Sequence, residues 1–138
     1  MERLEDLLPK NKHDSNRVTQ LKYLERKKLI PLIPELLTWI QDINWPIAPD
    51  VAELLLIYPN EIVPHIKNVL STNDDIWKYW CLEYLVKRMP LENRLRLKDD
   101  LVRMAKHPTV GEKLEEVDEL AIEIIQMSLN ENEFSPLK

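Results

Sequence analysis

Glycine is almost missing from this chain, which has one, Gly111, among 138 residues. One glycine cannot build a glycine-rich phosphate loop, and it leaves little material for the tight two-residue turns of β-hairpins. Proline occurs ten times, so proline placement and polar caps must shape the turns instead. The sequence therefore predicts an all-α fold of short helices.

Cysteine and long apolar runs are scarce as well. The one cysteine, Cys81, can form neither an internal disulfide nor a site of several thiolates, and a free cysteine usually lies in the core. No stretch reaches the roughly 18 to 20 apolar residues that cross a bilayer. The first six residues also lack the basic start and apolar run of a signal peptide. We therefore expect a cytoplasmic protein that does not enter a membrane.

The residues that are abundant indicate one globular domain. Apolar residues make up 44% of the chain and charged residues 31%, and a chain of this length suits a single core. We assign residues 1–11 to an N-terminal extension, residues 12–129 to the domain, and residues 130–138 to a polar C-terminal tail.

A repeat with a period of 30 residues predicts the architecture. Residues 30–40 align with residues 60–70, and a proline, Pro34 or Pro64, holds the same place near the expected start of each helix. The apolar pairs in register are Leu32/Ile62, Ile33/Val63, Leu36/Ile66, Trp39/Val69 and Ile40/Leu70. The preceding helices share the offset at Leu21, Val51 and Cys81, and at Leu24, Leu54 and Tyr84.

Three polar residues in the same register predict helix starts. Asp14, Asn44 and Asp74 each stand just ahead of a helical pattern, and each is of a type that caps helix N-termini. The expected helices span residues 15–28, 31–41, 47–58, 61–70, 75–89, 91–106 and 113–129. Hairpins of this length cannot bury their apolar faces alone, so they must stack. We therefore expect a short α-solenoid of about three hairpins plus a C-terminal helix.

Three segments resemble an uncharacterised bacterial family known only as a domain of unknown function. They are Lys12-His13-Asp14, residues 39–48 and residues 73–80, and the likeness extends over about residues 12–126. The paired helices are also similar to HEAT repeats, which mostly serve as binding scaffolds. This resemblance implies a helical fold and no particular activity. Some small bacterial proteins that neutralise toxins are similar short solenoids, an analogy of fold alone.

Charge is distributed unevenly along the C-terminal half. Residues 112–133 contain eight acidic residues and one lysine, whereas residues 87–106 contain seven basic and three acidic residues. Neighbouring helices of opposite sign should attract each other. The basic helix, with Arg94, Arg96 and Arg103, is the candidate nucleic-acid surface, but the net charge of −5 disfavours phosphate binding.

Catalytic motifs are not apparent. His13, His65 and His107 lie far apart and form no i, i+4 metal-binding pair. Asp74 and Asp75 resemble a carboxylate pair, yet a helix start needs one as its cap, and the helix dipole favours the other. The sequence therefore predicts no enzymatic activity, no cofactor and no metal site.

The remaining candidate site is the edge where the repeated helices begin. Aromatic residues beside acids at such an edge are typical of protein-binding hot spots. The predicted partner-binding residues are His13, Asp14, Asn44, Trp45, Asp74, Asp75, Trp77 and Lys78. For Trp77, ordinary packing between repeats is an equal alternative. The favoured function is binding to another protein, as an immunity-type or adaptor protein, and the alternatives are a HEAT-like nucleic-acid-binding or base-processing enzyme and a structural subunit of an assembly.

Overall fold

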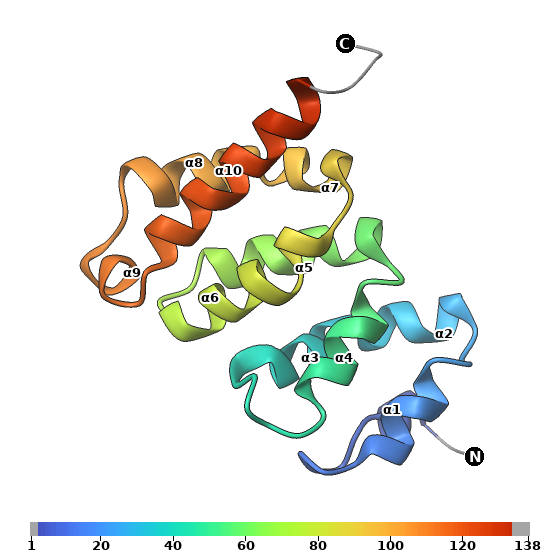
Figure 1. Cartoon of the computed structure of the whole chain (residues 1–138). Helices are drawn as coiled ribbons and strands as arrows, with labels where there is room; N and C mark the ends of the chain where they lie inside the picture. Colours follow the sequence, from blue (N-terminus) through green and yellow to red (C-terminus); the bar gives the residue numbers. More distant parts are fainter. Residues whose placement is uncertain (1–2, 134–138) are drawn as a thin grey trace.

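Short helices follow one another through residues 3–133, the part of the chain that the computed structural model describes (Figure 1). These residues contain no β-strand, so the all-α prediction is confirmed. None of their helices is long and apolar enough to cross a membrane. The ends of the predicted extension and tail, residues 1–2 and 134–138, lie outside the described residues.

The helices lie in three tiers from the N-terminus to the C-terminus (Figure 1). The first tier contains η1 (Leu4–Leu7), α1 (Ser15–Leu21), α2 (Arg26–Leu29), η2 (Ile30–Leu32), α3 (Ile33–Leu37), η3 (Thr38–Gln41) and α4 (Ala48–Leu55). The second contains α5 (Pro59–Leu70), α6 (Asp75–Tyr84) and η4 (Val86–Arg88). The third contains α7 (Leu91–Arg96), α8 (Lys98–Lys106), α9 (Val110–Leu114) and α10 (Val117–Glu133).

The helices of the first tier are shorter than the sequence predicts. The expected helix over residues 15–28 breaks after Leu21, because the next backbone N–H groups bond to carbonyls three residues back instead of four. Asp14 caps α1 as predicted, since its carboxylate accepts a hydrogen bond from the backbone N–H of Arg17. The predicted cap at Asn44 is wrong, because the turn that follows η3 delays the start of α4 to Ala48.

Pro64 lies inside α5, not near its start as the repeat suggests, because α5 begins five residues earlier at Pro59. A proline has no N–H to donate to the carbonyl four residues back, which here belongs to Asn60. A guanidinium from the third tier takes that place, since Arg96 Nη1 donates to Asn60 O at 3.4 Å. The Asn60 side chain in turn accepts a hydrogen bond from Asn93 Nδ2 at 2.8 Å.

The repeated apolar positions form the core. Leu21, Val51 and Cys81 are all buried, and burial raises the pKa of the Cys81 thiol. Of the residues paired between the two segments, all but the half-buried Trp39 are buried as well. The matched segments therefore occupy equivalent environments.

The opposite charges of residues 87–106 and 112–133 pair as expected. Ion pairs join Lys87 to Glu123 at 2.5 Å, Arg103 to Glu112 at 2.5 Å, and Arg94 to Glu131. These ion pairs hold residues 87–106, which we name the basic segment, against α9 and α10. Helix α10 continues four residues beyond the predicted boundary at residue 129, so the first part of the predicted tail is helical.

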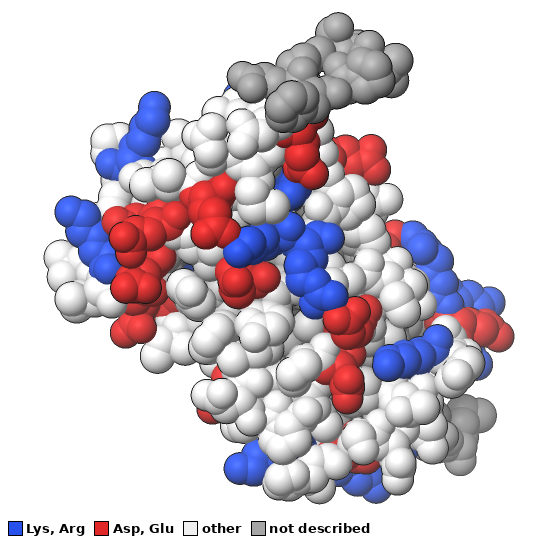
Figure 2. Space-filling view, viewed as in Figure 1, with Lys and Arg blue, Asp and Glu red and all other residues white. Residues whose placement is uncertain are grey.

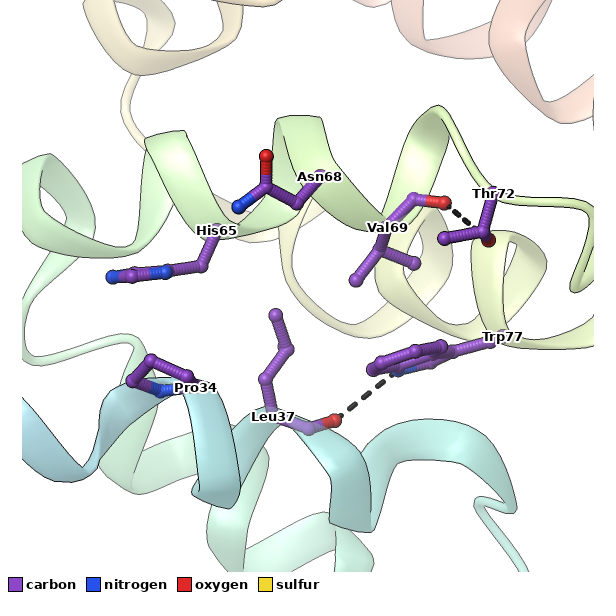
Figure 3. Close-up of a pocket in the computed structure, with 7 residues that line it drawn as sticks. All are labelled: Pro34, Leu37, His65, Asn68, Val69, Thr72 and Trp77. Atoms are coloured by element: carbon purple, nitrogen blue, oxygen red, sulfur yellow. Dashed lines mark hydrogen bonds between the residues drawn. The ribbon is translucent and has the colours of Figure 1, made fainter.

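Trp77 connects the first two tiers. Its indole Nε1–H donates to the Leu37 carbonyl, 3.2 Å away on α3. Figure 3 shows this bond beneath α5, at one end of a pocket of about 140 Å³ that has His65 at its other end. The indole thus supplies the inter-repeat packing that the sequence left as an alternative.

The Trp77 hydrogen bond should contribute measurably to stability. Trp77→Phe should lower the free energy of unfolding by about 1 kcal/mol more than Trp80→Phe, because only Trp77 loses a hydrogen bond. Trp80 is a matched control, since it is also half-buried, packs against the core and two tyrosine rings, and makes no side-chain hydrogen bond in the described residues. Urea unfolding of both variants measures the difference, and equal losses would contradict it.

Candidate partner-binding surface

Three connections, one from each tier, lie along one edge of the molecule, at the left of Figure 1: residues 42–47, 71–74 and 107–109. Contacts between tiers hold this edge together. Trp77 of the second tier reaches Leu37 of the first, and a buried ion pair joins α6 to α9. Within the first tier, the Ile47 N–H donates to the Lys12 carbonyl at 3.2 Å. The sequence-predicted residues of the three repeats therefore lie along one side.

Those residues differ in what they can offer a partner. His13 and Asn44 are exposed. Trp45 is half-buried against Trp39, with the two rings edge to face and their centroids 5.4 Å apart. Asp14 and Asp74 accept backbone hydrogen bonds as helix caps. The hydrogen bond from the Lys10 N–H lowers the pKa of Asp14, and burial offsets this effect only in part. The predicted edge is thus partly structural.

Lys78 departs most clearly from the predicted partner-binding role, because it is buried and only 2% exposed. Its ammonium lies 2.8 Å from Glu112 Oε2 and 2.9 Å from Asp75 Oδ1. Arg103 donates two hydrogen bonds to the same glutamate, at 2.8 and 2.5 Å. We name Asp75, Lys78, Arg103 and Glu112 the ionic cluster. Lys78 therefore acts through this cluster and does not itself reach a partner.

Glu112 is the centre of the cluster. It is fully buried, and with Thr109 it forms a capping box at the start of α9. Burial alone would raise its pKa, but the hydrogen bonds from Arg103, Lys78 and the Thr109 N–H outweigh burial and lower the pKa to about 2. The carboxylate is therefore charged at every physiological pH, as its two cationic partners require.

Gly111 is needed where it stands because of the same cluster. A Cβ added at this position would overlap with Asp75 Oδ2 and would lie 3.2 Å from Asp75 Cγ. The Asp75 carboxylate cannot retreat easily, because it is a short side chain held by Lys78. The only glycine of the chain thus allows α9 to approach the start of α6.

Helix α9 is inverted with respect to an ordinary amphipathic helix. Its one buried residue is Glu112, whereas Val110 and Leu114 are 75% and 76% exposed. Leu114 and the half-exposed Ile76 line a hollow of about 410 Å³ with Asp74, Asp75 and Glu115. We name Ile76, Val110 and Leu114 the apolar patch. It lies at the predicted edge and has an acidic rim.

The sequence analysis did not find this patch. The signal was present in Thr109-x-x-Glu112, the spacing of a capping box, which places a helix start at residue 110. On a helix that begins there, residues 110 and 114 share one face. That this face points outward depends on Lys78, 34 residues away in the chain, which no local pattern reveals.

A second hollow is acidic. Glu83, Glu116, Glu119 and Glu123 line it together with Tyr79 and Lys87, and Figure 2 shows acidic side chains gathered on this side of the molecule. Burial, followed by the charges of Glu83 and Glu116, raises the pKa of Tyr79.

Among the described residues no group of three or more histidine, cysteine or acidic residues has the geometry to hold a metal ion.

The ionic cluster should make stability depend on acid pH. Because the folded-state pKa of Glu112 is about 2 against an ordinary 4.5, its contribution is complete above about pH 4.5 and is lost as the pH falls toward 2. Glu112→Gln should cost about 3 kcal/mol at pH 7, and this difference from the unaltered protein should shrink at pH 3. Urea unfolding measures it, with Glu115→Gln as the exposed control. A difference that stays constant with pH would contradict it.

Gly111 and Asp75 should be energetically coupled. A Gly→Ala change inside a helix ordinarily stabilises it by up to about 1 kcal/mol, whereas Gly111→Ala should destabilise this protein because of the clash with Asp75. Adding Gly111→Ala to Asp75→Ala should cost nothing further, since the clash is gone. Thermal unfolding of the four proteins in the cycle measures the coupling, and additive effects would show that the two residues do not meet.

Comparison with known protein families covers the region that contains the features described above. No curated protein sequence matches the chain. A family model described as a domain of unknown function, DUF5071, matches residues 7–125, which include the ionic cluster and the apolar patch. Since the match covers most of the chain, the protein belongs to the DUF5071 family.

Proposed function

We propose that this protein is a short HEAT-like α-solenoid that binds another protein without catalysing a reaction, as an immunity-type or adaptor protein. The observation that carries the proposal is the inversion of α9, which buries Glu112 and exposes Val110 and Leu114. Burying a charge is costly unless it is well paired, and exposing two large aliphatic side chains forfeits hydrophobic stabilisation. Such an arrangement is reasonable where a partner covers the aliphatic side chains.

The spacing of contacts between tiers supports the solenoid. Side chains join across tiers at separations close to one repeat: Arg26–Glu61, Glu53–Arg88, Lys67–Asp100, Asn60–Asn93 and Lys78–Glu112. In a stack of repeats each unit contacts its neighbours, so contacts recur at about the repeat length. A bundle folded around one centre would also join the first and last helices.

The rim of the apolar patch indicates the chemistry of the partner. Asp74, Asp75 and Glu115 line the hollow beside Leu114, and Glu115 has no ion pair within residues 3–133. Complementary potentials favour association. The proposed partner surface therefore combines an aliphatic or aromatic side chain with lysine or arginine at its border.

A nucleic-acid ligand is less well supported. Arg103 forms an ion pair with the buried Glu112, and Arg96 donates to a backbone carbonyl. Phosphate binding would have to displace these intramolecular partners, whereas its affinity comes from cations that are free to contact phosphate.

A permanent structural subunit is also less well supported, because obligate interfaces are larger and more hydrophobic than a patch of three residues with an acidic rim. The proposal places the protein in the cytoplasm, where the Cys81 thiol stays reduced.

Site-specific cross-linking tests the proposal. A photoreactive residue at position 114 should cross-link to one protein in a lysate of the source cells, whereas the same residue at position 23 should not, although Tyr23 is also strongly exposed. With that partner purified, Leu114→Ala and Val110→Ala should each weaken binding about 10-fold, which corresponds to 1.4 kcal/mol. Both variants should keep the stability of the unaltered protein, since the two side chains are exposed.

Two results would decide against this function. Cross-links equally strong from positions 23 and 114 would show that the patch is not the interface. Loss of the captured protein after nuclease treatment or at raised salt would indicate that nucleic acid bridges the two. Co-expression with the captured protein then separates the two types of role, since an immunity-type protein restores growth and Leu114→Ala should not.

A further inference from the structure

Arg94 is buried in apolar surroundings with unused donors. It lies on α7, is only 3% exposed, and neither its Nε nor its Nη2 makes a hydrogen bond in the described residues. Glu131 of α10 contacts Nη2 as an ion partner, without hydrogen-bond geometry. Burial lowers the pKa of Arg94. A buried guanidinium with free N–H groups is costly unless something accepts them.

Arg94 is one of the residues that line a pocket of about 200 Å³ between α7, α8 and α10. Its walls are mostly aliphatic: Leu95, Leu101, Val102, Ile125 and Leu129. Lys98 also lines it, and the Ser128 hydroxyl is satisfied because it donates to the Ile124 carbonyl at 2.8 Å. The polar groups left for a ligand are therefore both cationic.

We propose that this pocket binds an organic carboxylate with a short aliphatic chain. The carboxylate takes the place of Glu131 and accepts from Nε and Nη2 of Arg94, which is the fork geometry that carboxylates match. The aliphatic chain lies against Leu129 and its apolar neighbours. A volume of about 200 Å³ is below the roughly 300 Å³ of drug-sized sites, so the chain is short.

Glu131 is the internal evidence for a carboxylate. It already brings a carboxylate oxygen to Arg94, so the position accepts this group. The Glu131 side chain is half-exposed, which allows it to turn into solvent when a ligand enters. An intramolecular carboxylate that occupies the site competes with the ligand, so its removal should tighten binding.

This site is separate from the apolar patch. The patch is built on α6 and α9, whereas the pocket lies between α7, α8 and α10. Binding at one can therefore be tested without disturbing the residues of the other. The same carboxylate chemistry has two sources, a free aliphatic acid or the terminal carboxylate of a peptide that ends in an aliphatic residue.

Titration with octanoate, followed by NMR of the backbone amides of the full chain, tests the proposal. Octanoate should shift the amides of residues 94–102 and 125–131, and 1-octanol and acetate should each bind at least 10-fold more weakly. Octanol lacks the carboxylate, and acetate lacks the chain. Equal binding of octanoate and octanol would overturn the proposal, because the pocket would then be only an apolar cavity.

Variants of the pocket test the role of Arg94. Glu131→Gln should bind octanoate at least 3-fold more tightly, while Glu119→Gln, an exposed acid on the same helix, should bind as the unaltered protein does. Arg94→Met should bind at least 10-fold more weakly. Should that variant fail to fold, Leu129→Glu replaces it, because a new carboxylate at the half-exposed rim position 129 competes in the same way.

A peptide arm identifies the source of the carboxylate. N-acetyl-Gly-Leu with a free C-terminus should bind more tightly than octanoate if peptides are the natural ligands, and more weakly if free acids are. The amidated peptide should not bind in either case. Amide shifts that fall only outside the pocket, or a Glu131→Gln variant that does not tighten binding, would show that Arg94 and Glu131 form a structural pair alone.

Discussion

The buried contact between Lys78 and Glu112 determines how the third tier meets the second. Helix α9 has five residues, and Glu112 is the only one that it buries, so hydrophobic burial does not hold it in place. Charge does, through Lys78, Arg103 and the capping box with Thr109. The outward direction of Val110 and Leu114 follows, because a helix that buries its third residue must expose residues on the opposite side. The apolar patch is therefore a consequence of the ionic cluster.

Much of the fold could be predicted because apolar periodicity reports burial directly. The paired positions Ile33/Val63 and Leu36/Ile66 are buried in both segments, and α1 and α6 begin after their expected caps. The helix breaks could not be predicted in the same way. Pro64 is accommodated inside α5 because Arg96, 36 residues away from Asn60, donates to the Asn60 carbonyl in place of the N–H that proline lacks. A local rule for proline cannot include a partner in the next tier.

The candidate site was predicted in part, for an equally physical reason. The register of the 30-residue repeat predicts that Asp74, Asp75 and Trp77 lie at the edge, and the structure has them at the start of α6 on that edge. Whether an edge residue faces outward depends on contacts between tiers. Lys78 has the sequence context of a surface lysine three residues after Asp75, yet it is buried because Glu112 supplies a counter-charge from another repeat. Conversely, Val110 and Leu114 look like core residues in the sequence and are exposed.

The acidic residues of the last segment serve two opposed purposes. Glu112, Glu123 and Glu131 neutralise cations of the basic segment. Four more, namely Glu115, Glu116, Asp118 and Glu119, have no ion partner in the part of the chain that the structure describes. Glu116 is held at a positive φ of 62°, a conformation that glycine adopts at lower cost, although the only glycine of the chain stands five residues earlier. Acidic side chains without an ion partner therefore gather between α9 and the first turn of α10, next to Leu114 in the chain.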